Sequence, residues 1–208
     1  MKKLALCIGL CLYCIGIWAI DTSFQKKGNE LLFTLLEGSV KLEFCTDDMF
    51  RVRHTQGKEF TENEQWMVRK YDFAPVNYSV EEKTAEWVIT TDKLIIKASK
   101  SPFCLTVSGK DGTVLYSELA DRRLYADSVK TKVALQPDEH FFGFGERMDF
   151  MDQRGRKVYL NVELGRGVKP AVGGKDILRA NYCPVPFMMS TKGYGVFFHT
   201  YRVEYGMG

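Results

Sequence analysis

The sequence lacks the compositional extremes of a non-globular chain or of a nucleic-acid-binding protein. Its 208 residues include 29 Lys and Arg against 26 Asp and Glu, so the formal net charge is only +3. Without a strong basic surplus, nothing in the composition favours nucleic acid as a partner. Hydrophobic residues make up 45% and charged residues 26%, which excludes disorder, a collagen-like repeat and a coiled coil. We therefore expect a chain that folds around a hydrophobic core.

Histidine is scarce, and its placement gives no support to a metal site. His54, His140 and His199 stand at no ligand-like spacing, and no Cys-x-x-Cys or His-x-Glu lies near them. We expect no metal and no cofactor. His54 is interpreted as a surface residue at the end of a strand, and His199 as a buried, hydrogen-bonded residue.

Motifs for nucleophilic catalysis and dinucleotide binding are also missing. The sequence has no Gly-x-Ser-x-Gly, and no cysteine lies in a recognised protease context. The segment Gly143–Arg147 has two glycines but lacks the third glycine of the dinucleotide-binding loop. These absences exclude the common hydrolase and Rossmann signatures.

The one long hydrophobic run lies at the N-terminus. Two lysines precede the apolar run Leu4–Ile20. This order predicts a signal peptide over residues 1–20, with Ala19 as the small residue before the cut. It also predicts an exported protein, periplasmic or extracellular, with no membrane contact after cleavage. A retained signal anchor is the alternative, because the run is at the short limit for spanning a bilayer. Bulky residues precede the three cysteines of the run, which disfavours a lipoprotein.

Removal of this segment would leave Cys45, Cys104 and Cys183. An odd number at irregular spacing forms neither a disulfide framework nor a zinc site. One disulfide is left open, with no pair favoured. Cys104 is interpreted as a small, half-buried strand residue.

After residue 30 the hydrophobic residues recur with a period of two. Val40, Leu42 and Phe44 alternate with Lys41, Glu43 and Cys45, and the same alternation recurs in 50–53 and 103–108. This period predicts strands with one buried face. Further strands are expected over 31–36, 74–80, 84–90, 93–98, 113–118, 132–136, 157–162, 186–190 and 194–200. A dozen short strands of this kind predict an all-β fold, an antiparallel β-sandwich.

Turn signals separate these strands, notably Ser108–Gly112 and Thr191–Gly193. The only helix-like stretch after the N-terminal segment is Thr61–Lys70, and it is short.

Glycine is concentrated in the C-terminal third. Eleven of the 18 glycines lie from Gly143 onward, which indicates backbone positions with positive φ or a close approach of another group. We therefore divide the mature chain into a scaffold over roughly 24–136 and a specialised part over 137–208. Within the latter, the stretch from Asn161 to Ala180 is long, glycine-rich and charged. Loops of this length in a compact domain are usually functional.

Five short blocks between residues 139 and 200 carry a resemblance to a known family. They read Phe-Phe-Gly-Phe-Gly-Glu-Arg at 141–147, Gln-Arg-Gly at 153–155, Leu-Asn-Val-Glu at 160–163, Tyr-Cys-Pro-Val-Pro-Phe-Met-Met-Ser at 182–190 and Gly-Tyr-Gly-Val-Phe-Phe at 193–198. Their order resembles the N-terminal domain of glycoside hydrolase family 31, the α-glucosidases and α-xylosidases. The resemblance covers essentially the whole mature chain.

The resemblance implies a galactose-mutarotase-like β-sandwich over residues 21–208. In the family this domain precedes a (β/α)8 barrel, packs on it and sends one loop to the sugar site. The barrel carries the catalytic aspartates and needs about 200 residues, which this sequence does not contain. We therefore expect no catalytic residue in the chain and no glycosidase activity from it alone. The implied partner is an α-linked carbohydrate, bound together with the barrel.

The resemblance also implies a set of substrate-binding candidates in the loop. Glu163 matches the aspartate of the family's Trp-Asn-x-Asp block, while Leu160 replaces its tryptophan. These departures leave the substrate class open. Arg166, Lys175 and Asp176 are added because they are charged and lie in the same loop.

Two other functions remain as alternatives. One is a stand-alone carbohydrate-binding sandwich, although only Trp66 and Trp87 remain after the N-terminal segment and an aromatic sugar platform is not evident. The other is an aldose epimerase on the same fold. That reaction needs a general acid and base, usually His with Glu, and the three histidines stand outside any epimerase motif.

Overall fold

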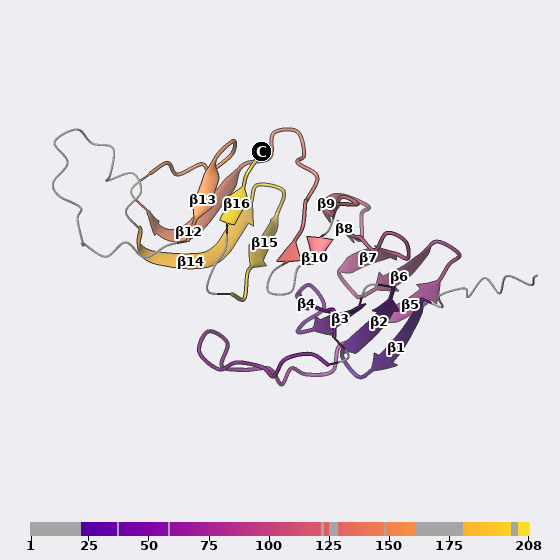
Figure 1. The fold of residues 1–208 in the computed structure, drawn as a ribbon. Helices are drawn as coiled ribbons and strands as arrows, with labels where there is room; N and C mark the ends of the chain where they lie inside the picture. The colour runs from indigo at the N-terminus through magenta and orange to yellow at the C-terminus, as the bar shows by residue number, and fades with distance from the viewer. Residues whose placement is uncertain are drawn as a thin grey trace, which may run out of the picture.

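In the part of the chain that the structure describes, the regular secondary structure is entirely β, which confirms the expected fold class (Figure 1). In this computed structural model the described residues are 22–36, 38–57, 59–121, 123–124, 129–147, 149–160, 181–200 and 204–208. None of them forms a helix that is long and apolar enough to span a membrane. The predicted signal peptide lies outside them.

Two antiparallel sheets form the N-terminal half. The first has the order β1-β2-β3-β4, and the second has the order β5-β6-β7-β8-β9. The strands of the first are β1 (Ser23–Lys27), β2 (Glu30–Leu35), β3 (Gly38–Phe44) and β4 (Phe50–Thr55). Those of the second are β5 (Ser79–Glu82), β6 (Glu86–Thr90), β7 (Leu94–Ser99), β8 (Leu105–Gly109) and β9 (Val114–Ser117). Each strand pairs with its neighbour in sequence, so both sheets are meanders.

The larger hydrophobic core lies between these two sheets. Val40, Leu42 and Phe44 of β3 are buried, as their alternation predicts, and they share one cluster with side chains of the second sheet. The rings of Phe33 and Trp87 join the sheets at a centroid distance of 4.9 Å. This packing of two inner faces is that of a β-sandwich.

The C-terminal half contains smaller sheets around a second cluster. Their orders are β12-β14-β15, β13-β16 and β10-β11. The strands are β10 (Arg123–Leu124), β11 (Val129–Lys130), β12 (Phe141–Arg147), β13 (Lys157–Tyr159), β14 (Asn181–Ser190), β15 (Tyr194–Phe197) and β16 (Glu204–Gly206). The buried members of the second cluster are Phe141, Phe144, Val158, Met188, Tyr205 and Met207. In Figure 1 the β13-β16 pair lies against the sheet that contains β12 and β14.

Strand β12 shows why this region is rich in glycine. Gly143, Phe144 and Gly145 all have positive φ, and the register with β14 shifts between the two glycines. A Cβ on Gly145 would lie 2.0 Å from the carbonyl oxygen of Cys183, so no side chain fits there. The expectation of positive φ and close approach is confirmed at both glycines.

Most of the predicted strands coincide with observed ones. The exceptions are 74–80, of which only Ser79 and Val80 belong to a strand, and 132–136, which forms the single bridge Glu118–Val133. The period of two did not predict β1, β10, β11, β12 or β16. Four of these strands contain a single apolar residue each, and two glycines interrupt the alternation in β12.

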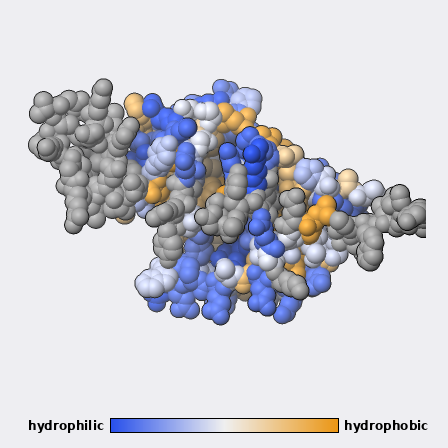
Figure 2. All heavy atoms as spheres, viewed as in Figure 1, coloured by the Kyte–Doolittle hydropathy of each residue, from blue (hydrophilic) through white to orange (hydrophobic). Residues whose placement is uncertain are grey.

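The predicted helix over Thr61–Lys70 is wrong. These residues belong to a loop that runs from β4 to β5 across the outer face of the first sheet, along the hydrophilic lower edge of the molecule in Figure 2. Arg53 binds the Thr61 carbonyl, and Arg51 donates to Asn63 Oδ1 at 2.7 Å. A helix this short is marginal by itself, and these contacts with the sheet hold an extended backbone instead.

Candidate functional site

The predicted substrate-binding residues Glu163, Arg166, Lys175 and Asp176 lie outside the described residues. The structure does describe the two strands between which their loop runs. β13 ends at Tyr159, and β14 begins at Asn181.

Arg147 contacts both of the strands that flank this loop. It pairs with Asn181 across the β12–β14 ladder, and its Nη1 donates to the Tyr159 carbonyl at 3.5 Å. Its Nε donates to Asp149 at 2.9 Å, and both charged side chains are largely buried. The last arginine of the Phe-Phe-Gly-Phe-Gly-Glu-Arg block therefore fixes the positions at which the loop leaves and re-enters the fold.

A buried carboxylate, Glu139, organises the other end of the same sheet. Its side chain is 0% exposed; Oε1 accepts hydrogen bonds from Ser190 Oγ at 2.6 Å and from Tyr194 OH at 2.8 Å. Oε2 accepts the backbone N–H of Gln136 at 2.9 Å. The carboxylate raises the pKa of Tyr194, after burial, which is the larger cause. Its acceptors are thus occupied by the protein, and its role is to join β14 and β15 to the segment before β12.

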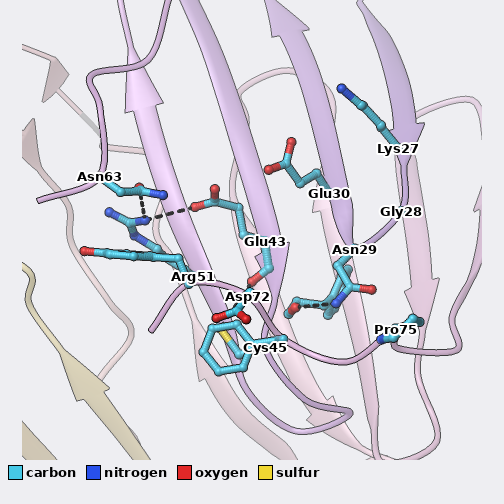
Figure 3. A pocket seen from close by; sticks show the side chains of 13 residues that line it. Lys27, Gly28, Asn29, Glu30, Glu43, Cys45, Arg51, Asn63, Asp72 and Pro75 are labelled. Atoms are coloured by element: carbon cyan, nitrogen blue, oxygen red, sulfur yellow. Dashed lines mark hydrogen bonds and ion pairs between the residues drawn. The ribbon is translucent and has the colours of Figure 1, made fainter. Parts of the chain in front are cut away.

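A cavity of about 510 Å³ with both polar and apolar walls lies on the first sheet, beneath the loop that follows β4 (Figure 3). The strands contribute Glu30, Glu43 and Arg51, and the loop contributes Asn63 and Asp72. Figure 3 shows Glu43, Arg51 and Asn63 side by side, with Arg51 bonded to both neighbours. Sequence reasoning missed this cavity because its residues belong to four strands and a loop.

His199 connects this loop to the C-terminal half. Its Nε2 binds the Glu64 carboxylate, and its Nδ1 lies 3.2 Å from Arg51 Nη2. The imidazole also stacks between the rings of Tyr71 and Phe197, at 6.4 and 5.8 Å. The expectation of a hydrogen-bonded histidine is confirmed, but the side chain is half-buried rather than buried, and its partners lie at the junction of the two halves rather than in either hydrophobic cluster. His54 lies within β4 opposite Val40 and is half-buried.

The contact between His199 and Glu64 predicts a dependence of stability on acid pH. Desolvation would raise the pKa of Glu64, but hydrogen bonds from His199 and from the backbone of Trp66 and Met67 outweigh it and hold the pKa at about 2, below its ordinary 4.5. A depressed carboxyl pKa stabilises the fold above pH 4.5, and this contribution disappears as the pH falls towards 2. Urea unfolding at pH 7 and pH 3 should therefore show a smaller acid-induced loss of stability in Glu64→Gln than in the unaltered chain.

The control for this measurement is Glu62→Gln. Glu62 is an exposed neighbour with no hydrogen bond or ion pair to any described residue. The control should keep the full acid-induced loss, and the same reduction in both variants would contradict the assignment to Glu64.

Cys45, Cys104 and Cys183 are free thiols, so the disulfide left open by the sequence is not formed. Cys104 is half-buried as expected and lies directly before β8, where its N–H binds Ser99 Oγ at 2.9 Å. Burial and the nearby Glu43 raise the pKa of the Cys45 thiol, which disfavours a reactive thiolate. Among the described residues, no group of three or more His, Cys, Asp or Glu side chains could hold a metal ion.

Comparison with known proteins identifies the fold and the family together. A sequence profile described as the glycosyl hydrolase 31 N-terminal galactose mutarotase-like domain matches residues 39–203. The chain belongs to glycoside hydrolase family 31. The resemblance drawn from the five sequence blocks is confirmed, and the chain corresponds to the N-terminal domain of the family 31 enzymes.

Relatives in family 31 are much longer than this domain. The isomaltosyltransferase of Sporosarcina globispora is 28% identical over 174 residues, which are 78% of this chain and 14% of that protein. Alpha-glucosidase 2 of Bacillus thermoamyloliquefaciens is 26% identical over 190 residues, 88% of this chain and 23% of that enzyme. A Flavobacterium johnsoniae family 31 dextranase complexed with isomaltotriose superposes with a TM-score of 0.77 at 27% identity, over 90% of this chain and 23% of the dextranase. The chain thus spans less than a quarter of these proteins.

Proposed function

We propose that this family 31 domain packs on a catalytic (β/α)8 barrel of an exported α-glycosidase and contributes the loop at 161–180 to its sugar site. The domain itself supplies no catalytic residue. Glu163 contacts substrate hydroxyls in this proposal, and Arg166, Lys175 and Asp176 belong to the same surface. The sugar bound is an α-linked glycoside, in keeping with the isomaltotriose complex of the dextranase.

The observation that carries this proposal is the outward face of β14. Met188 and Ser190 point into the second core, whereas the alternate residues Val185, Phe187 and Met189 are 40%, 38% and 48% exposed. A strand that is apolar on both faces is typical of one covered on both sides.

The exposed face continues onto β15 and approaches the loop. Phe197 is 43% exposed and pairs directly with Phe187. A Cβ on Gly195 would lie 2.7 Å from the Phe187 ring, so the glycine lets this ring lie flat over the neighbouring strand. β14 begins directly after the loop at 161–180. A barrel packed on this face would therefore also contact the C-terminal end of that loop.

The first test is the gene. The DNA that follows codon 208 should continue in frame into a (β/α)8 barrel of about 200 residues or more. The purified chain 21–208 should not hydrolyse an aryl α-glycoside, whereas the complete polypeptide should do so. A stop codon in the natural gene, or cleavage by the chain alone, would overturn the proposal.

Phe187→Asp tests the docking face in the complete polypeptide. A carboxylate buried against the barrel without a partner should destabilise the domain contact by roughly 3 kcal/mol or more and lower kcat/KM with it. In the isolated domain the same change should cost only about 1 kcal/mol, the loss of the cross-strand contact with Phe197. Val114→Asp is the matched control, since Val114 of β9 is 41% exposed and lies on the other half of the chain. Equal effects of the two variants would contradict the assignment.

A further inference from the structure

We propose that the cavity on the first sheet is a second carbohydrate site, which takes one or two units of a neutral sugar independently of the loop at 161–180. The choice of a sugar as ligand rests on the proposed function, whereas the site itself rests on the geometry of the cavity. Its volume of about 510 Å³ lies within the range of small-ligand pockets.

The charges around the cavity favour an uncharged ligand that both donates and accepts hydrogen bonds. Lys27 and Arg51 line it together with Glu30, Glu43 and Asp72, so charges of both signs face the same space. A phosphate or a simple cation would meet repulsion from one of these sets. A sugar hydroxyl can donate to a carboxylate and accept from an ammonium or amide group at the same time.

Several of these polar groups are unused by the protein. Within the described part of the chain, the Lys27 ammonium, the Asp72 carboxylate and Asn63 Nδ2 make no hydrogen bond or ion pair. Glu43 Oε2 is buried and accepts no hydrogen bond, although the Arg51 guanidinium lies 3.4 Å from it as an ion-pair partner and Oε1 pairs with Lys41 at 2.9 Å. Buried polar atoms normally make a hydrogen bond, so Oε2 retains the capacity to accept one from a ligand hydroxyl in the cavity.

The walls of the cavity are fixed before any ligand binds. Asn29 donates to the Ala74 carbonyl at 2.8 Å and accepts from the Val76 N–H at 2.9 Å, which holds one end of the loop against the sheet. The contact between Arg51 and Asn63 holds the other end. Because both ends are fastened, little loop ordering is required on binding.

Aromatic rings supply the apolar part of the wall. Tyr71 and Phe73 of the loop line the cavity, and the Tyr71 ring lies 5.1 Å from the Arg51 guanidinium. A pyranose has an apolar face made of C–H groups, and hydroxyls around its edge. A wall that combines aromatic rings with hydrogen-bonding groups suits both parts of the sugar.

The test is a titration of the purified chain with isomaltotriose, followed by calorimetry and by amide chemical shifts. Saturable binding should shift amides of β2, β3, β4 and residues 63–75. Asp72→Asn removes the unpaired loop carboxylate and should weaken binding about tenfold, the effect of one hydrogen bond to a charged group. Asp92→Asn is the matched control: Asp92 is an exposed acid in the turn between β6 and β7, outside the cavity.

Three results would overturn this inference: no saturable binding, shifts confined to residues 181–200, or equal weakening in the two variants. Circular dichroism of each variant confirms that the fold is retained. The proposed role as a barrel-supporting domain does not depend on these outcomes, because the gene and the Phe187→Asp variant test it separately.

Discussion

Trp87→Ala should lower the free energy of unfolding of the domain by about 3–5 kcal/mol, the usual cost of removing a buried tryptophan side chain. Trp87 is 0% exposed and lies in the centre of the larger core. Its ring contacts Phe33 at 4.9 Å and Phe24 at 6.1 Å, and the Lys100 ammonium lies 4.9 Å above it. The substitution would leave a cavity between the two sheets that neither strand ladder can close. Urea unfolding followed by far-UV circular dichroism measures the effect.

Trp66→Ala provides the control for that measurement. Trp66 is 85% exposed on the loop after β4, so its removal should change the unfolding free energy by no more than about 0.5 kcal/mol. A loss of similar size in both variants would mean that Trp87 is not the centre of a packed core.

Glu139→Ala should destabilise the C-terminal half by about 3–5 kcal/mol, because it leaves buried partners without their acceptor. The hydroxyls of Ser190 and Tyr194 and the N–H of Gln136 all donate to this carboxylate. Hydrogen exchange should show the loss in β12, β14 and β15, while the exchange of β2, β3 and β6 remains unchanged.

Two further variants separate the network from a general effect of charge. Tyr194→Phe removes one hydrogen bond and should cost about 1 kcal/mol. Glu146→Ala removes an exposed carboxylate of β12 and should be nearly neutral. If Glu146→Ala were as costly as Glu139→Ala, the buried network could not be the cause.

The fold class could be predicted from the sequence because polar and apolar residues alternate wherever one face of a strand is exposed to solvent. In β3 the inward Val40 and Leu42 alternate with Lys41 and Glu43, and the contrast is unmistakable. In β14 the outward residues are as apolar as the inward ones, so only its last half was predicted from periodicity. Tertiary contacts also overrode the local preference at 61–70, where Arg53 of β4 binds the Thr61 carbonyl and Arg51 binds the Asn63 side chain.

The candidate sites also differ in whether a local sequence pattern predicts them. The loop at 161–180 could be found because family 31 motifs flank it in a fixed order along the chain. Glu139 could not, since a single acidic residue before a strand looks like a solvated one until Ser190 and Tyr194 are seen to surround it. The cavity on the first sheet joins residues up to 48 positions apart, from Lys27 to Pro75, and no local sequence pattern predicts such an arrangement.

The pairing of β13 with β16 sets an order of events during synthesis of the chain. The first cluster and the side chains packed against it all lie between Phe24 and Tyr116, so that sandwich can close while the ribosome is still adding the rest. The second cluster requires Tyr205 and Met207, which emerge well after the first cluster is complete. Until Tyr205 and Met207 are synthesised, Phe141, Phe144 and Met188 lack these packing partners. Within this domain, the C-terminal half is therefore the part that stays longer without a complete hydrophobic core during synthesis.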